Sequence, residues 1–347
     1  MTSLLYNVSR LSYRLVDEVR DDVALQSPSR LTRSDGDIRG EIREVVLHFL
    51  QEIDVGYPGS LPDYQELYAD CCDRARLYGF PMAGTWNLAP YIDAGVVMAA
   101  CAYQHTPYEN RVFVALYTAA FLQLDVLGET ELDGCANFVS CMLQAKAQKI
   151  PSLDALTSFL RDIATYCVPV VGELSLAAGI NFIAAIAIED LSKDMIGHPE
   201  AEGYAAYKRY LDGLGDCYAG TIFPPEIPLV DYLQALPEIS KLCCAANDVL
   251  SFYKEELAGE TDNVVGNRAR AGGISHIEAY KKVTADCIEL HKKIVMILSG
   301  SPAAVSAYKA WLPGYVQFHT SLDRYRLDEL QIPVGAPSKS QRANQRV

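Results

Sequence analysis

The chain has 347 residues, of which 50% are hydrophobic and 21% are charged, so it can bury a large core and is not disordered in composition. Its 44 acidic residues outnumber its 30 basic residues and give a net charge of −14, which excludes the basic surface typical of nucleic-acid-binding proteins. No window offers about 18 uninterrupted apolar residues, so no membrane span is expected.

The ten cysteines form no C-x-x-C pair, and most lie in apolar stretches where a thiol behaves as a small hydrophobic group. This usage favours a reducing compartment over a disulfide framework. The first residues, MTSLLYNVSRLSYRLVDEVRDD, carry Arg and Asp too early for a signal peptide. We therefore expect a cytoplasmic protein.

Apolar residues recur every three or four positions through most of the chain, and alternating strand-like runs are scarce, which predicts an all-α fold. Breakers such as YPGSLPD and FPPEIP separate the predicted helices. In chain order these cover residues 36–53, 61–78, 86–104, 108–126, 130–148, 152–168, 171–194, 201–217, 228–258, 274–299 and 302–330. The domain organisation follows: an N-terminal segment that is partly ordered (1–35), one helical domain (36–334) and a flexible tail (335–347).

A row of polar residues interrupts the apolar pattern of the predicted helix 228–258. Asn247, Ser251 and Glu255 are spaced by four and therefore share one helix face. Their amide, hydroxyl and carboxylate oxygens are ligands that Mg²⁺ accepts beside water and substrate phosphates. A merely solvated helix face has the same pattern, and on spacing alone it is the favoured interpretation. Two neighbouring features favour a metal site instead: Lys254 lies beside the row, and the apolar turns EISKLCCAA precede it.

Three segments carry a resemblance to a known family. NDVLSFYKE (247–255) resembles the N-D-x-x-S-x-x-K-E signature of class I terpene synthases, and it is most similar to the fungal trichodiene synthase-like group. YKRYLDGLGDCYAGTIFPPE resembles the segment that carries the diphosphate-sensing arginine, here Arg209. HTSLDRYRLDEL resembles the C-terminal Arg-Tyr motif, here Arg324 and Tyr325. All three blocks keep the family order.

The resemblance implies a fold, a cofactor and a substrate. The fold is a single-domain helical bundle around a central apolar cavity. The cofactor is Mg²⁺, with three ions, and the substrate is a prenyl diphosphate. The charge and composition add that no nucleic acid and no membrane span are expected, and a homodimer is left open. Arg209, Lys254, Arg324 and the Tyr325 hydroxyl would then donate hydrogen bonds to diphosphate oxygens, with the guanidinium groups suited to bidentate contact.

The family's other metal motif, D-D-x-x-D, is altered in this chain. Its place holds Asp125-Val126-Leu127-Gly128-Glu129, in which Asp125 keeps the first position and Val126 replaces the second acid. By the resemblance, Asp125 is expected to bind metal. Glu129 lies four residues later and is left open between a ligand, a partner of a ligand and a surface acid. Gly128 could instead end the helix there.

An apolar pocket would have to fold the prenyl chain and exclude water. Tyr117, Thr118 and Phe121 lie one to two turns before Asp125, and Phe318 belongs to an aromatic stripe with Trp311 and Tyr315 that leads towards Arg324. Gly179 lies in VVGELSLAAGINF, which is a candidate for the kinked helix that lines the pocket in this family. Aromatic residues at helical spacing more often form ordinary core, and a helical glycine can equally serve close packing.

Three functions compete. The first is a sesquiterpene cyclase acting on farnesyl diphosphate, because the group that the chain resembles contains sesquiterpene synthases; a humulene-type macrocycle is one candidate product. The second is a chain-elongating prenyltransferase, which the Asn/Ser/Glu row disfavours because that chemistry normally uses two complete D-D-x-x-D motifs. The third is a non-catalytic paralogue, which Val126 favours and which the joint presence of the other motif residues opposes.

Overall fold

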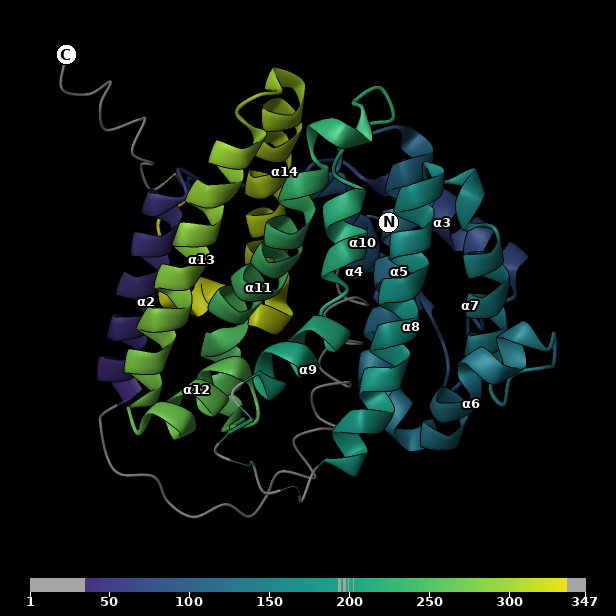
Figure 1. The fold of residues 1–347 in the computed structure, drawn as a ribbon, viewed down its shortest axis with the longest axis horizontal. Helices are drawn as coiled ribbons and strands as arrows, with labels where there is room; N and C mark the ends of the chain where they lie inside the picture. The colour runs from purple at the N-terminus through teal and green to yellow at the C-terminus, as the bar shows by residue number, and fades with distance from the viewer. Residues whose placement is uncertain (1–34, 193–194, 196–197, 199, 202, 336–347) are drawn as a thin grey trace, which may run out of the picture. The chain divides into compact units, whose positions relative to one another are not determined.

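The structure is a computed structural model, which describes residues 35–192, 195, 198, 200–201 and 203–335. The described residues contain helices and no strand, and the all-α prediction is confirmed. The helices are α2 (Asp35–Glu52), α3 (Gln65–Tyr78), α4 (Ala89–Ala102), α5 (Tyr108–Leu127), α6 (Leu132–Leu143), α7 (Pro151–Arg161), α8 (Pro169–Leu191), α9 (Tyr204–Asp212), α10 (Gly215–Gly220), α11 (Leu236–Ala258), α12 (Val264–Gly272), α13 (His276–Leu298) and α14 (Pro302–Ser321) (Figure 1). Short 3₁₀ turns connect several of them, including Gly128–Glu131, Asp323–Tyr325 and Leu327–Leu330.

The contacts of the chain group into two compact units. The first unit takes in the described residues of Met1–Leu61, Ala245–Lys292 and Tyr315–Val347, and the second takes in those of Pro62–Cys244 and Lys293–Gly314. The predicted N-terminal segment and C-terminal tail fall almost entirely outside the described residues, so the proposed domain boundaries stay predictions.

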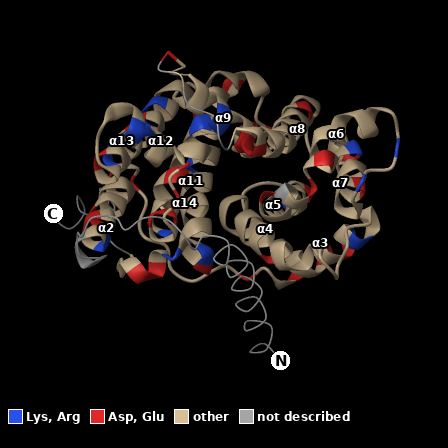
Figure 2. Cartoon of the chain, turned by 90° about the horizontal axis from the view of Figure 1, so that it is seen from below, with Lys and Arg blue, Asp and Glu red and all other residues tan. Residues whose placement is uncertain are grey.

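Helix α5 is the centre of the second unit, where α3, α4 and α8 contact it (Figure 2). Helices α5 and α8 are long and apolar enough to cross a membrane, but 72% and 50% of their most apolar windows are buried inside the protein. Both are therefore core helices. Gly95 allows α4 to approach α5 closely, because a Cβ atom there would lie 2.0 Å from the carbonyl oxygen of Ala115 on α5.

The first unit is held together around the end of α11. Tyr280 of α13 donates a hydrogen bond to the carbonyl oxygen of Val249 over 2.8 Å, and its ring stacks on Phe252 at 4.3 Å. The Tyr253 hydroxyl accepts from Arg39 Nε on α2 and donates to Glu329, both at 3.0 Å. Helices α2, α11 and α13 and the turn at Leu327–Leu330 therefore share one set of contacts.

Several predicted helix boundaries are wrong, and at two of the breaks a residue adopts the left-handed conformation. The helix predicted over 302–330 ends at Ser321, because Leu322 is extended and Arg326 adopts a left-handed conformation with φ of 55°. The helix predicted over 201–217 breaks into α9 and α10 at Leu214, which is also left-handed at φ of 52°. Helix α12 was missed, although the Asn263 side chain caps it by accepting from the Gly266 amide at 2.7 Å.

Candidate active site

The predicted metal row lies on α11, within the first unit. Helix α11 continues without interruption through Asn247, Ser251 and Glu255, so the three side chains share one face as expected. Ser251 is buried, with 2% of its surface exposed, and Asn247, Lys254 and Glu255 are partly buried. The row therefore does not lie on an ordinary solvated face.

The Asn247 side chain contacts His319. The amide nitrogen of Asn247 lies 3.1 Å from His319 Nε2, and His319 Nδ1 lies 2.8 Å from the carbonyl oxygen of Tyr315. Burial lowers the pKa of His319 to about 4, so the ring is neutral. An amide whose nitrogen faces His319 directs its oxygen elsewhere, and that oxygen is the atom that could coordinate a metal.

The Ser251 hydroxyl provides a test of whether this row fits a metal ion. Its oxygen is buried and has no hydrogen-bond partner among the described residues. A buried hydroxyl without a partner is costly, and such atoms call for an explanation such as a bound ion or water. Together with the amide oxygen of Asn247 and the carboxylate of Glu255, it forms the hard oxygen donor set that Mg²⁺ prefers. The residues present fit the ion.

The Glu255 carboxylate is held by the residue that caps α12. Asn263 donates its amide N–H to Glu255 Oε2 at 2.9 Å, while its oxygen accepts from the Gly266 amide. One side chain therefore fixes both the start of α12 and the position of the only carboxylate in the row.

We expect Asn263→Ser to raise the Mg²⁺ concentration needed for half-maximal activity by about 10-fold, because partners that orient metal ligands typically contribute this much. Serine caps helices as well as asparagine does, but it is too short to reach Glu255, so the thermal unfolding midpoint should change little. A Mg²⁺ titration of the initial rate measures the effect. Asn263→Ala serves as the comparison, since it loses the cap as well; an unchanged Mg²⁺ dependence in Asn263→Ser would show that Glu255 needs no such support.

The predicted Arg-Tyr pair also lies in the first unit, on the 3₁₀ turn Asp323–Tyr325 rather than on the predicted helix. Tyr325 is buried and its ring contacts that of His319, with 4.7 Å between centroids. The Arg324 guanidinium lies over the Tyr325 ring at 5.5 Å. His319 thus contacts both Asn247 of the metal row and Tyr325 of the Arg-Tyr pair, and it links the two.

Asp125 and Arg209 belong to the second unit. Asp125 is exposed in the last turn of α5. On α9, whose basic positions are visible in Figure 2, Arg209 pairs with Asp212 at 2.8 Å and donates to the carbonyl oxygen of Cys244 at 3.2 Å. Burial raises the pKa of Asp212, and the negative charge of Asp125 adds to this effect while Arg209 opposes it. Asp125 and Asp212 are thus close enough to repel each other, and a divalent cation would relieve that repulsion.

The altered Asp-rich motif is only partly described. Helix α5 ends at Leu127 and Gly128 begins a 3₁₀ turn, so the helical spacing that would align Asp125 with Glu129 is not continued. A Cβ atom at Gly128 would lie 2.8 Å from Ile186, which explains the glycine by close packing. The side chain of Glu129 lies outside what the structure describes, and its role stays a prediction.

Four of the five predicted pocket residues, Tyr117, Thr118, Phe121 and Gly179, lie close together in the second unit. The Phe121 ring lies 4.4 Å from that of Tyr117, and a Cβ atom at Gly179 would come within 2.7 Å of Phe121 and 3.2 Å of the Tyr117 hydroxyl. Tyr117 donates to the carbonyl oxygen of Ser175, and Thr118 shares a hydrogen bond with Tyr218. These side chains are buried.

Helix α8 is not broken, contrary to the expectation that residues 170–182 contain the kink. It runs from Pro169 to Leu191 across Gly179, whose missing side chain makes room for Phe121. The break lies instead between α9 and α10. There a Cβ atom at Gly213 would lie 2.2 Å from Cys244 Sγ, and one at Gly215 would lie 2.5 Å from the Ser240 carbonyl oxygen, so this break contacts α11 directly.

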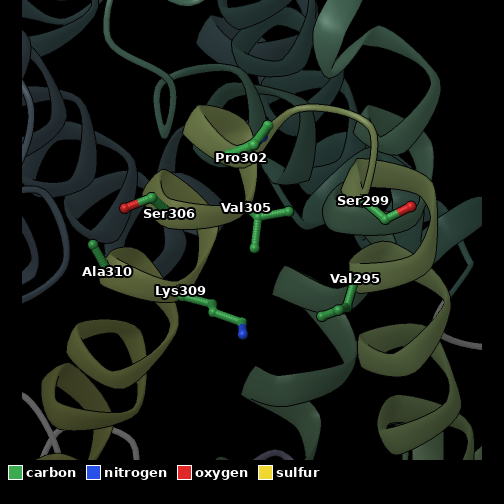
Figure 3. Close-up of a pocket in the computed structure, with 7 residues that line it drawn as sticks. All are labelled: Val295, Ser299, Pro302, Val305, Ser306, Lys309 and Ala310. Atoms are coloured by element: carbon green, nitrogen blue, oxygen red, sulfur yellow. The ribbon is translucent and has the colours of Figure 1, made fainter.

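The remaining pocket candidate, Phe318, lies in the first unit, buried edge-on against Tyr325 at 6.0 Å. A separate hollow of about 760 Å³ lies in the second unit, between the end of α13 and the start of α14 (Figure 3). It is lined by Val295, Ser299, Pro302, Val305, Ser306, Lys309 and Ala310. None of the predicted site residues belongs to this hollow.

Sequence reasoning missed three residues that act on the predicted site residues. Asp212 follows Arg209 by three positions on the same helix, so its pairing could have been expected from the spacing. His319 and Asn263 gave no such signal, because the first is separated from Asn247 by 72 positions and the second lies in an unpredicted helix start. No group of three or more His, Cys, Asp or Glu side chains with metal-binding geometry occurs among the described residues.

Comparisons with known proteins agree with the motifs. Alpha-cuprenene synthase of Coprinopsis cinerea is 31% identical over 297 residues, which cover 85% of this chain and 91% of that protein. Longiborneol synthase of Gibberella zeae is 26% identical over 314 residues, covering 88% and 93%. The crystal structure of linalool/nerolidol synthase from Streptomyces clavuligerus in complex with 2-fluorogeranyl diphosphate has a TM-score of 0.53 at 16% identity, and covers 80% of this chain and 97% of that one.

The chain shares the all-α fold of class I terpene synthases. Residues 87–344 match the family described as trichodiene synthase (TRI5), and the chain belongs to that family. The protein is therefore a terpene cyclase, a lyase that acts on a prenyl diphosphate. Enzymes of this class typically depend on Mg²⁺.

Proposed function

We propose that the protein ionises farnesyl diphosphate in a Mg²⁺-dependent reaction and cyclises the allylic cation to a sesquiterpene, releasing diphosphate. The observation that carries this proposal is the buried Ser251 hydroxyl, which has no partner among the described residues and stands in the Asn247–Ser251–Glu255 row of a chain that belongs to this family. The ten cysteines, none of which forms a disulfide, and the buried helices α5 and α8 support a cytoplasmic enzyme.

The metal ligands follow from the donor atoms. Asn247, Ser251 and Glu255 would hold Mg²⁺ through their oxygens, and Asp125 would bind it in the second unit, with three ions in total. Bound Mg²⁺ would supply Lewis-acid stabilisation of the diphosphate as it leaves. Arg209, which pairs with Asp212, and Arg324, which lies over the Tyr325 ring, would donate hydrogen bonds to the diphosphate oxygens. Lys254 and the Tyr325 hydroxyl would donate to the same oxygens.

The reaction begins when the allylic C–O bond breaks and its electron pair leaves with the diphosphate. The resulting cation is attacked by a double bond of the same chain, and loss of a proton ends the sequence. The Tyr117 and Phe121 rings would stabilise the cation through their faces, and their burial would keep water from quenching it. A humulene-type macrocycle is our candidate product, because a reduced Asp-rich motif fits a short sequence of cations.

The direct test incubates the purified protein with geranyl, farnesyl and geranylgeranyl diphosphates in Mg²⁺, with chelator as the control, and analyses volatile products. We expect a cyclic sesquiterpene from farnesyl diphosphate and matching release of diphosphate. Longer prenyl diphosphates formed on adding isopentenyl diphosphate would establish chain elongation instead. No turnover of any substrate by folded protein would favour a non-catalytic paralogue.

We expect Asp125→Asn to lower kcat by about 100-fold while the protein stays folded, since the side chain is exposed and its loss removes charge from a proposed metal ligand. The comparison is Asp133→Asn, an exposed acid that pairs with Lys149 at 3.2 Å. Rates for both variants at saturating substrate and Mg²⁺ measure the effect. A normal rate in Asp125→Asn would show that the first metal site lies elsewhere.

A further inference from the structure

We propose that His319 is a positioning residue that determines which atom of the Asn247 amide is presented to the metal. This inference rests on the proposed function, because it assumes that Asn247 is a ligand. The residue itself touches neither substrate nor metal; it acts through the hydrogen bond to Asn247.

The tautomer of His319 follows from its first hydrogen bond. His319 Nδ1 lies 2.8 Å from the backbone carbonyl oxygen of Tyr315, one turn earlier on α14. A carbonyl oxygen can only accept, so Nδ1 must carry the proton. In a neutral imidazole the other nitrogen, Nε2, then has a lone pair and can only accept.

That lone pair discriminates between the two orientations of the Asn247 amide. Asn247 Nδ2 lies 3.1 Å from His319 Nε2 and can donate to it. Rotation of the amide by 180° would set its oxygen against the lone pair, which is repulsive, and would leave the NH₂ group facing the proposed metal. An NH₂ group cannot serve as a ligand for Mg²⁺, so the ring selects the one orientation in which the row has three oxygen donors.

The ring can select an orientation because it is buried and packed against other rings. His319 is 0% exposed. Its ring contacts those of Tyr315 at 4.7 Å, Phe318 at 4.9 Å and Tyr325 at 4.7 Å. A ligand-supporting group must be held by its own neighbours to be effective, and this one is held from three sides.

Two substitutions separate the two hydrogen bonds of His319. His319→Asn retains a donor for the Tyr315 carbonyl oxygen but is too short to reach Asn247. His319→Gln retains an acceptor near the position of Nε2. The readout is Mn²⁺ affinity in the presence of inorganic diphosphate, measured by electron paramagnetic resonance, with the unfolding midpoint of the metal-free protein as the check on folding.

We expect His319→Asn to weaken Mn²⁺ binding by about 10-fold and His319→Gln to stay close to wild type. Asn247→Ala alone should weaken binding at least as much, and adding His319→Asn to it should cause no further loss. If His319→Asn does not fold, His319→Leu replaces it, since leucine also lacks the acceptor and fills more of the space.

Each other outcome has a definite meaning. Unchanged Mn²⁺ affinity in His319→Asn, or an equal loss with and without Asn247, would overturn the role of His319. The proposed function would survive that result if Asn247→Ala still weakened Mn²⁺ binding. If Asn247→Ala left the affinity unchanged, the row would not be a metal site, and the proposed function would lose its main support together with this inference.

Discussion

Replacing Glu255 by glutamine is expected to reduce turnover by at least about 100-fold without unfolding the protein. Even partners that only orient metal ligands contribute up to this factor, and Glu255 is the single carboxylate of the row. Glutamine keeps the length of the side chain and an oxygen that can accept from Asn263, which lies 2.9 Å from Glu255 Oε2. The substitution therefore removes charge and little else.

The measurement is kcat for farnesyl diphosphate over a range of Mg²⁺ concentrations, together with the unfolding midpoint. The matched control is Glu256→Gln, the adjacent acid on α11, whose carboxylate lies 2.9 Å from His276 Nδ1 rather than in the row. The control should turn over at close to the wild-type rate. A normal rate for Glu255→Gln in Mg²⁺ would remove Glu255 from the set of metal ligands.

The helical fold could be predicted from sequence, because a period of three to four residues is a local property that burial enforces. The errors occur where a tertiary contact determines the break. Gly213 and Gly215 are local signals for a break after α9, which ends at Asp212, but the sequence does not show that these glycines lie against Ser240 and Cys244 of α11. Arg326 likewise adopts its left-handed conformation after a helix that the sequence would have continued.

The metal row could be predicted from the sequence, whereas the residues that orient its side chains could not. Asn247, Ser251 and Glu255 lie on one continuous helix, so spacing alone places them on one face. Their partners come from other segments, His319 from α14 and Asn263 from the start of α12, and a single sequence carries no signal for such pairings. Sequence therefore indicates the donor atoms, and the structure indicates how they are oriented.

For the Arg-Tyr pair, the sequence predicted which residues belong to the site but not the backbone conformation that holds them. Arg324 and Tyr325 were expected on a long helix, where their side chains would point in different directions. On the 3₁₀ turn the Arg324 guanidinium instead lies over the Tyr325 ring, which contacts His319. The end of α14 thus connects the Arg-Tyr pair to the support of the metal row within one unit.

The second large effect is expected for Gly95→Ala, which should lower the free energy of unfolding by about 3 kcal/mol or more. A Cβ atom at this position would lie 2.0 Å from the Ala115 carbonyl oxygen and 3.1 Å from the Ala119 amide nitrogen. Both atoms are backbone of α5, so the clash can be relieved only by separating α4 from α5. The higher helix propensity of alanine offsets only about 1 kcal/mol of this loss, so the net effect on stability is unfavourable.

Gly40→Ala is the control, because this helical glycine of α2 is exposed and a Cβ atom there meets nothing within 4 Å. Only the higher helix propensity of alanine then matters, and the free energy of unfolding should rise by about 0.5–1 kcal/mol. Chemical denaturation of both variants measures the two changes. Since α5 also carries Asp125, activity should fall with stability in Gly95→Ala and stay normal in Gly40→Ala. Wild-type stability in Gly95→Ala would mean that α4 and α5 do not touch at this glycine, and the central helix contact of the second unit would have to be reassigned.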